Sequence, residues 1–146
     1  MDGVYPSEVF SDGVIKFEES GDRHNPLAAV LYRGKETCSK LVFDKYDLVG
    51  APPKVGSVFP YTVHGVKNLF VIITWATDHS GLGIKGTSYQ VYAYQDDGSG
   101  GLRENDAISN ANQMFGIEGM EDFKDSHFFG KNPAEVKQLV DKLGLK

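Results

Sequence analysis

The side chains that most often carry catalysis or hold metals are few and widely separated in this sequence. The histidines are His24, His64, His79 and His127, and the one cysteine is Cys38. No two histidines have the spacing that places zinc ligands on one helix face, and one cysteine makes neither a zinc motif nor an internal disulfide. Cys38 could serve as a nucleophile beside a histidine that folding brings near it. Its strand-like surroundings favour a small core residue instead.

Two glycine-rich segments imitate ligand-binding motifs. Residues 81–86, Gly-Leu-Gly-Ile-Lys-Gly, match the Gly-x-Gly-x-x-Gly pattern of dinucleotide-binding proteins. Strand-like residues follow them, however, and not the helix whose N-terminus would hold a phosphate. Residues 96–101 resemble half of a calcium loop but lack its alternating acids and final glutamate, so a hairpin turn is predicted. With no nucleophile elbow or phosphate loop either, the sequence predicts no cofactor, no metal and no enzymatic activity.

The segment Asp78-His-Ser-Gly-Leu-Gly-Ile-Lys-Gly86 is the strongest candidate for a binding role. It reads as a nine-residue loop with three glycines between the two strongest predicted strands, 68–77 and 87–95. One interpretation is a flexible hairpin end without a role. The other is a protruding loop that enters a partner's cleft, where its imidazole or hydroxyl meets a catalytic residue. On that interpretation the binding residues are Asp78, His79, Ser80, Gly81, Leu82, Gly83, Ile84 and Lys85.

The negative charge is concentrated in one stretch. The 146 residues have a formal net charge of −5, and residues 96–125 contain eight acids and two bases. A nucleic-acid-binding protein normally has a basic face, so no nucleic-acid partner is predicted. The acidic stretch is either a solvated face or a surface complementary to a basic protein. On the second interpretation Asp96, Asp97 and Glu104 also contact the partner.

The elements that must position these residues are mainly strands. Glycine occurs 17 times and aromatic residues make up 12% of the chain, which is typical of strands joined by tight turns. The continuous apolar run near residues 69–73 predicts a central strand covered on both faces, and Pro60 predicts an edge strand or a bend. Strands are predicted at 4–10, 14–18, 28–33, 36–43, 57–63, 68–77 and 87–95, with a two-residue turn at Gly34-Lys35.

Helix is predicted only late in the chain. Asp106 could cap a short helix over 107–114, and Asn132-Pro133 is a strong helix start. The spacing of Val136, Leu139, Val140 and Leu143 gives one apolar stripe, and Gly144 ends the helix. We therefore expect one α+β domain spanning residues 1–146, a mostly antiparallel sheet with a short helix and a C-terminal amphipathic helix.

The longest apolar stretch, Leu69–Ile73, is far shorter than the roughly 20 residues of a membrane helix, so no membrane partner is predicted. The start, Met1-Asp-Gly-Val-Tyr-Pro6, shows no signal peptide and resembles the beginning of a mature domain. A periplasmic protein lacking its export signal and a cytoplasmic protein both fit this start.

One order of segments resembles a known group of proteins. It consists of Leu69-Phe-Val-Ile-Ile-Thr-Trp, a Ser-Gly-containing loop, Ser88-Tyr-Gln-Val-Tyr-Ala-Tyr and Asp97-Gly-Ser-Gly-Gly-Leu. This pattern of strands, loop and helix, over roughly residues 66–143, is similar to small bacterial periplasmic inhibitors. These include lysozyme inhibitors and immunity proteins that neutralise cell-wall-degrading effectors of contact-dependent or type VI secretion. The resemblance implies that residues 78–86 plug the active site of a basic toxin or hydrolase, with His79 and Ser80 nearest the tip.

Two other classes stay open. Trp75, Tyr89, Tyr92 and Tyr94 could line a sugar-binding pocket of a small ligand-binding domain or enzyme, although the same residues serve as ordinary core. A structural or secretion-accessory domain that self-assembles is the third possibility.

Overall fold

The fold of this chain rests on two antiparallel sheets, seen in a computed structural model that describes residues 4–34 and 39–144. The first sheet has the order β1-β2-β3-β4, and the second has the order β10-β9-β7-β6-β5, with β8 paired to β7. The first sheet comprises β1 (Val4–Pro6), β2 (Gly13–Glu19), β3 (Leu27–Arg33) and β4 (Ser39–Tyr46). The second comprises β5 (Lys54–Val63), β6 (Val66–His79), β7 (Ile84–Asp96), β8 (Leu102–Glu104), β9 (Phe115–Glu121) and β10 (Lys124–Ser126). With helices α1 (Asp106–Ser109) and α2 (Pro133–Lys142), the fold is broadly α+β, as predicted.

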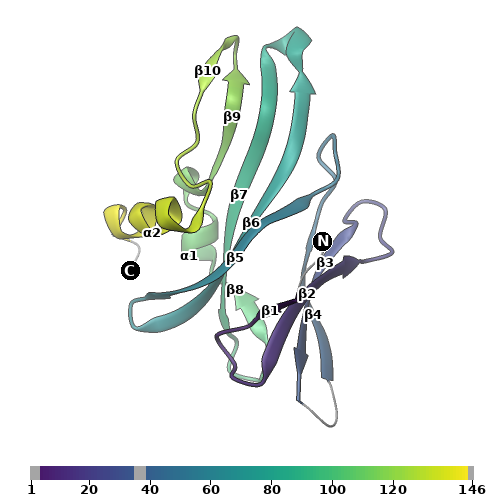
Figure 1. Cartoon of the computed structure of the whole chain (residues 1–146), viewed down its shortest axis with the longest axis vertical. Helices are drawn as coiled ribbons and strands as arrows, with labels where there is room; N and C mark the ends of the chain where they lie inside the picture. The colour runs from purple at the N-terminus through teal and green to yellow at the C-terminus, as the bar shows by residue number, and fades with distance from the viewer. Residues whose placement is uncertain (1–3, 35–38, 145–146) are drawn as a thin grey trace.

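Strand β6 lies between the two halves of the core. Its alternate side chains Leu69, Val71, Ile73 and Trp75 are buried against the first sheet. Phe70 and Ile72 point the other way and pack with residues of α1 and α2. Figure 1 shows the first sheet and the helices on opposite sides of the long strands. The prediction of a central strand covered on both faces is therefore confirmed, because burial on both faces requires a nearly continuous apolar sequence.

Several element boundaries follow the sequence signals. Strand β5, which contains Pro60, is one of the edge strands of the second sheet in the described part of the chain. Helix α2 begins at Pro133, and the Asn132 side chain caps it by accepting a hydrogen bond from the Glu135 amide at 2.9 Å. The buried side chains of α2 are Val136, Leu139 and Val140.

Other predicted boundaries are wrong. The first strand ends at Pro6 because the buried Ser7 hydroxyl binds both the amide and the carbonyl of Phe10, which closes a turn. The helix expected over 107–114 divides into α1 and a 3₁₀ turn, Asn112–Met114, and α1 is preceded by Asn105 as its N-cap. Cys38, the predicted turn residue Lys35 and the start of the 36–43 strand lie outside the described residues.

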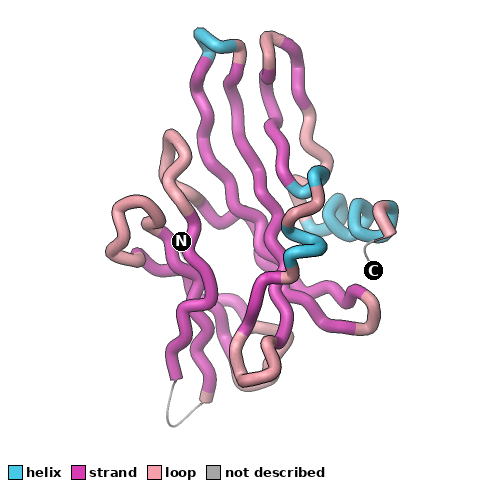
Figure 2. Tube along the Cα trace, turned by 180° about the vertical axis from the view of Figure 1, so that it is seen from behind, coloured by secondary structure: helices cyan, strands magenta, loops and turns pink. Residues whose placement is uncertain are grey.

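The predicted nine-residue loop is also wrong. Strands β6 and β7 remain paired up to His79 opposite Ile84, so residues 80–83 alone connect them. Polar residues and glycines can continue the β6–β7 pairing because its hydrogen bonds come from the backbone. Strand β9 also pairs with the other edge of β7, from Gln90 to Lys85. Figures 1 and 2 show the β6–β7 and β9–β10 hairpins projecting together beyond the rest of the molecule.

Candidate functional site

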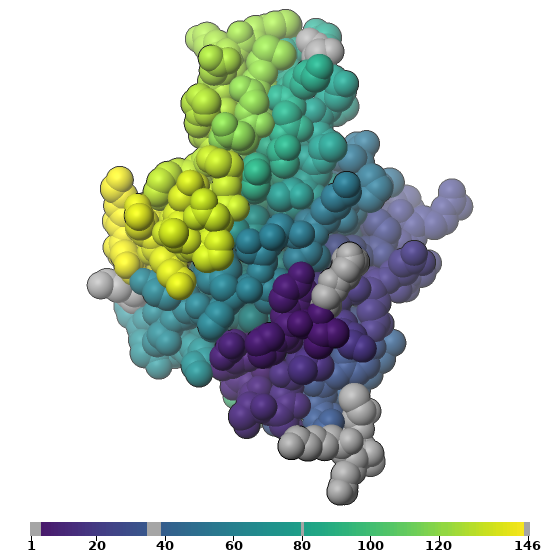
Figure 3. All heavy atoms as spheres, in the orientation of Figure 1, coloured from purple at the N-terminus to yellow at the C-terminus, as the bar shows by residue number. Residues whose placement is uncertain are grey.

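The ends of the two projecting hairpins form one surface, which we call the twin tip (residues 78–86 and 118–125). Lys85 and Gly86 of β7 pair with Met120 and Gly119 of β9. Beyond the last strand pair, the Phe123 amide donates a hydrogen bond of 3.0 Å to the Gly83 carbonyl. Figure 3 shows the two hairpin ends side by side. Backbone contacts between the paired strands and between the two connecting turns therefore hold the hairpin ends together.

Two large apolar side chains are exposed at the twin tip. Leu82 is 71% exposed and Phe123 is 67% exposed, the two highest values among the exposed large apolar residues that the structure describes. An exposed apolar side chain gains nothing from the hydrophobic effect in the free protein. Aromatic residues in such positions are a common feature of the energetic centres of protein interfaces.

The backbone beneath Phe123 is strained. Asp122 and Phe123 form the two-residue turn between Glu121 and Lys124, and their φ angles are +56° and +61°. A turn with two positive φ angles favours Asn-Gly, Asp-Gly or Gly-Gly, and a phenylalanine there is an outlier. Such conformations cost on the order of 1–3 kcal/mol each and persist where the surrounding structure holds them. The turn holds the Phe123 ring in an exposed position.

Gly83 permits the close approach of the two hairpins. Its φ is +77°, and a Cβ placed on it would lie 2.5 Å from the Phe123 amide nitrogen and 2.6 Å from ring atoms of Phe123. Any other residue would be strained by the backbone conformation and would push the β9–β10 turn away. Gly81, in the same connection, has open space around it.

The twin tip is rimmed by more acids than bases. Asp78, Glu121, Asp122 and Asp125 are exposed, against the exposed cations Lys85 and Lys124. The exposed charges of the twin tip therefore sum to a negative value.

A fifth acid, Glu118, has a structural role instead. Its carboxylate accepts hydrogen bonds from His127 Nδ1 at 2.9 Å and the Phe128 amide at 3.0 Å, and Lys131 Nζ lies 3.2 Å away. These groups, His127 first, lower the pKa of Glu118 to about 2. Glu118 thereby ties residues 127–131 to β9.

The twin tip contains most of the predicted binding residues, and the structure shows where each lies along the hairpin. Gly81 and Leu82 are exposed at the end, while Gly83 is buried and Ile84 is half-buried. The sequence predicted His79 nearest the tip, but His79 is the last residue of β6, paired with Ile84, and its ring lies toward Gly50 of the preceding connection. Asp78 and Lys85 form an exposed cross-strand pair, and the backbone of Ser80 begins a 3₁₀ turn.

Asp96, Asp97 and Glu104 lie away from the twin tip. Along β7, Asp96 is roughly 36 Å from Lys85 at about 3.3 Å per residue. The Asp97 carboxylate accepts bonds from the Ser99 and Gly101 amides, which closes the predicted turn and lowers the pKa of Asp97. Glu104 is half-buried, and its pKa is raised by burial and by nearby Asp44. The predicted loop and these three acids therefore form two separate surfaces.

The aromatic side chains considered for sugar binding belong to the core. Trp75 and Tyr94 are buried between the sheets, and the indole nitrogen of Trp75 donates to the Asp47 carbonyl at 2.8 Å. Tyr89 stacks on Phe128 with ring centroids 5.5 Å apart, and Tyr92 packs on Tyr46. Trp75 and Tyr94 therefore have no free ring face, and the half-buried Tyr89 and Tyr92 each pack against another aromatic ring.

Residues that the sequence did not single out complete the site. Asp122 and Phe123 lie within the acidic stretch but carry no turn signal, because neither glycine nor asparagine occupies the turn. Within the described ranges, no three histidine, cysteine or acidic side chains are grouped to hold a metal ion. None of the helices described is long and apolar enough to span a membrane.

Comparison with known proteins gives no relative. Neither a family model, nor a curated protein, nor a solved structure matches this chain. The geometry of the twin tip is therefore the basis for a functional proposal.

Proposed function

We propose that this chain is a binding protein of the immunity or inhibitor type and not an enzyme. It inserts the twin tip into the active-site cleft of a basic toxin or cell-wall hydrolase. The observation that carries the proposal is Phe123, an exposed aromatic side chain held on a strained turn beside Leu82. A strained backbone at an exposed, apolar position is a common feature of sites shaped for binding.

The shape of the twin tip supports insertion into a cleft. Two paired hairpins project together, and the bond from Phe123 to the Gly83 carbonyl fixes their ends relative to each other. A preformed anchor loses less conformational entropy on binding than a flexible loop does. Leu82 and Phe123 would fill an apolar subsite, and the surrounding acids would face the cations of the partner.

The location follows from the partner. A cell-wall hydrolase acts in the periplasm, so we place this chain there, with a cytoplasmic site of toxin neutralisation as the alternative. On this proposal the partner is a secreted effector, such as one delivered by type VI secretion.

Calorimetry and an activity assay test the proposal together. The chain is titrated into basic cell-wall hydrolases, beginning with the enzyme encoded beside its gene and a basic lysozyme. We expect a one-to-one complex with loss of turnover. Phe123→Ser and Leu82→Ser should each weaken binding at least about 30-fold, as hot-spot residues do.

The matched control is Val66→Ser. Val66 is also an exposed apolar residue beside a tight turn, but it lies at the other end of β6. It should leave binding unchanged. If no hydrolase binds, or if Val66→Ser weakens binding as much as Phe123→Ser, the proposal is wrong.

A further inference from the structure

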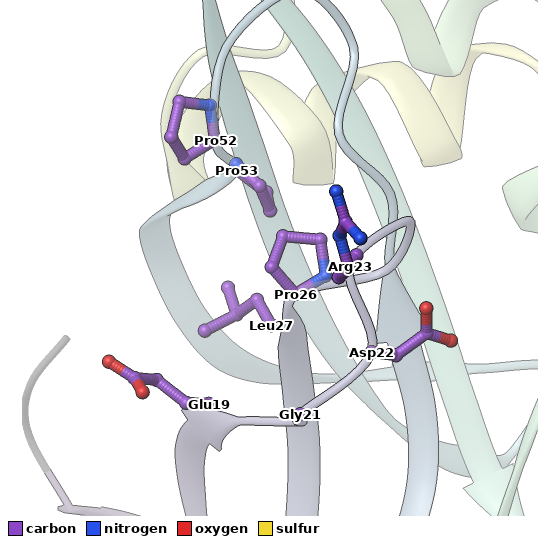
Figure 4. A pocket seen from close by; sticks show the side chains of 8 residues that line it. All are labelled: Glu19, Gly21, Asp22, Arg23, Pro26, Leu27, Pro52 and Pro53. Atoms are coloured by element: carbon purple, nitrogen blue, oxygen red, sulfur yellow. The ribbon is translucent and has the colours of Figure 1, made fainter.

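A second candidate site lies beside the first sheet and shares no lining residue with the twin tip. A hollow of about 460 Å³ opens between the β2–β3 loop and the connection that precedes β5. Its volume is within the range of small-molecule sites, which are mostly apolar hollows with a few polar groups. Figure 4 shows Pro26 and Leu27 on one side of it and Pro52 and Pro53 on another.

The walls of this hollow are preformed. The Ser20 hydroxyl accepts a bond from the Asp22 amide at 2.9 Å and donates one to the Asn25 carbonyl at 2.5 Å. The Asp22 carboxylate accepts bonds from the amides of His24 and Asn25, which lowers the pKa of Asp22. Prolines stiffen the opposite wall because their φ is fixed. A ligand would therefore meet a rigid surface, with little ordering to oppose its binding.

Two side chains of opposite charge stand at the rim. Glu19 and Arg23 both line the hollow, and Figure 4 shows them on opposite sides of Pro26 and Leu27. Both are exposed, and neither has a hydrogen bond or ion pair within residues 4–34 and 39–144. The Asp22 carboxylate is already bound to its own loop, so Glu19 and Arg23 are the charges available to a ligand.

We propose that this hollow binds a short zwitterionic peptide or peptide-like molecule with an apolar body. Its ammonium group would bind Glu19, its carboxylate would bind the planar fork of Arg23, and its side chains would lie on Pro26 and Leu27. A polyphosphate is disfavoured because the lining has one cation, and a sugar is disfavoured because the lining has no aromatic ring. This site is independent of the partner proposed for the twin tip.

Titration followed by amide NMR tests the proposal with a defined probe, the dipeptide leucyl-leucine. We expect saturable shifts of Gly21 and Leu27 at millimolar concentrations. N-acetyl-leucyl-leucine and leucyl-leucine amide should each bind at least about tenfold more weakly, because each cap removes one charge-assisted bond. In Glu19→Gln, the free and the N-acetylated dipeptide should bind equally, while the amide still binds more weakly than the free dipeptide. In Arg23→Gln, the free dipeptide and its amide should bind equally, while the N-acetylated dipeptide still binds more weakly.

Lys16→Gln is the control variant, since Lys16 is an exposed residue of β2 outside the lining. It should behave as the native chain does. Absence of saturable shifts with a well-dispersed spectrum, or equal shifts with the free and capped dipeptides, would overturn the proposal. Neither outcome bears on the twin tip, whose partner is assayed separately.

Discussion

Phe123 combines exposure, which gains it no hydrophobic stabilisation in the free protein, with a positive φ, which costs free energy. Replacing it with asparagine, which tolerates the left-handed conformation, should relieve the strain and raise the free energy of unfolding by about 0.5–1 kcal/mol. The same change removes the aromatic anchor and should weaken partner binding. Urea unfolding and calorimetry of Phe123→Asn measure the two effects.

The control for this trade-off is Phe115→Asn. Phe115 is also half-exposed, but its φ is −131°, so asparagine relieves no strain there. We expect no gain in stability from that change. If Phe123→Asn destabilises the chain as much as Phe115→Asn does, the positive φ of Phe123 does not lower the stability of the native chain, and the prediction is wrong.

Glu118 makes a pH-dependent contribution to stability. Because its pKa is lowered from 4.5 to about 2 in the folded chain, the contribution is fully present above pH 4.5 and is lost as the pH falls toward 2. The stability difference between the native chain and Glu118→Gln should therefore shrink across that window. Thermal unfolding from pH 6 to 2.5 measures it. A constant difference for Glu118→Gln across this pH range would contradict the assignment.

At the scale of elements, two glycines determine how β9 joins β7. Gly86 and Gly119 face each other with φ of +133° and +140°, and a Cβ on either would lie 2.1 Å or 2.3 Å from a carbonyl oxygen of the opposite strand. Gly119→Ala should separate the strands locally and cost roughly 2–4 kcal/mol.

Hydrogen exchange locates this effect. Amides of β9 and β10 should lose protection in Gly119→Ala, while those of β2 and β3 keep theirs. Gly81→Ala, at a position with open space, should change stability by less than about 0.5 kcal/mol. Uniform loss of protection throughout the sheet would contradict a local joint.

The strands and helix whose signals are local were predictable from the sequence. The apolar run of β6 and the Asn132-Pro133 start of α2 depend on a few neighbouring residues, and both are confirmed. The connection after Thr77 was misjudged because pairing with β9 extends a ladder through polar residues and glycines. The Asp122-Phe123 turn could not be predicted, since Phe123 opposes the left-handed conformation that the hairpin imposes on it.

At the scale of the whole molecule, a buried polar chain joins the two sheets. The hydroxyls of Tyr46 and Tyr94 are 2.6 Å apart, and Tyr94 donates to the Asp44 carboxylate at 2.5 Å. Tyr94→Phe would leave the buried Tyr46 hydroxyl and the half-buried Asp44 carboxylate without this partner and should lower the free energy of unfolding by about 1–3 kcal/mol. Chemical denaturation measures it.

Tyr92→Phe is the matched control on the same strand, since no hydrogen bond of its hydroxyl occurs within the described residues. It should be nearly neutral. If Tyr94→Phe lowers the free energy of unfolding no more than Tyr92→Phe does, the hydrogen bonds of Tyr94 do not stabilise the contact between the sheets.

The pKa of Asp44 is raised by burial. This carboxyl therefore favours the folded state less as the pH rises above 3.8, the opposite sign to Glu118.

The net charge of the chain follows from its composition, but the distribution of the charges over the surface depends on the fold. The acidic stretch 96–125 begins at the last residue of β7 and returns, through β9, to the opposite end of that strand. Its acids therefore occupy separate surfaces. Only Glu121, Asp122 and Asp125 reach the twin tip as exposed groups. Sequence distance alone could not show which acids face a partner together.

The central claim is that the twin tip is the recognised surface. Hydrogen exchange of the free chain and of its complex with the inhibited hydrolase tests this most directly. We predict that exchange slows in residues 78–86 and 118–125 of the complex and stays unchanged at 96–104. Protection confined to 96–104 or to the first sheet, with the twin tip exchanging as in the free chain, would contradict the claim.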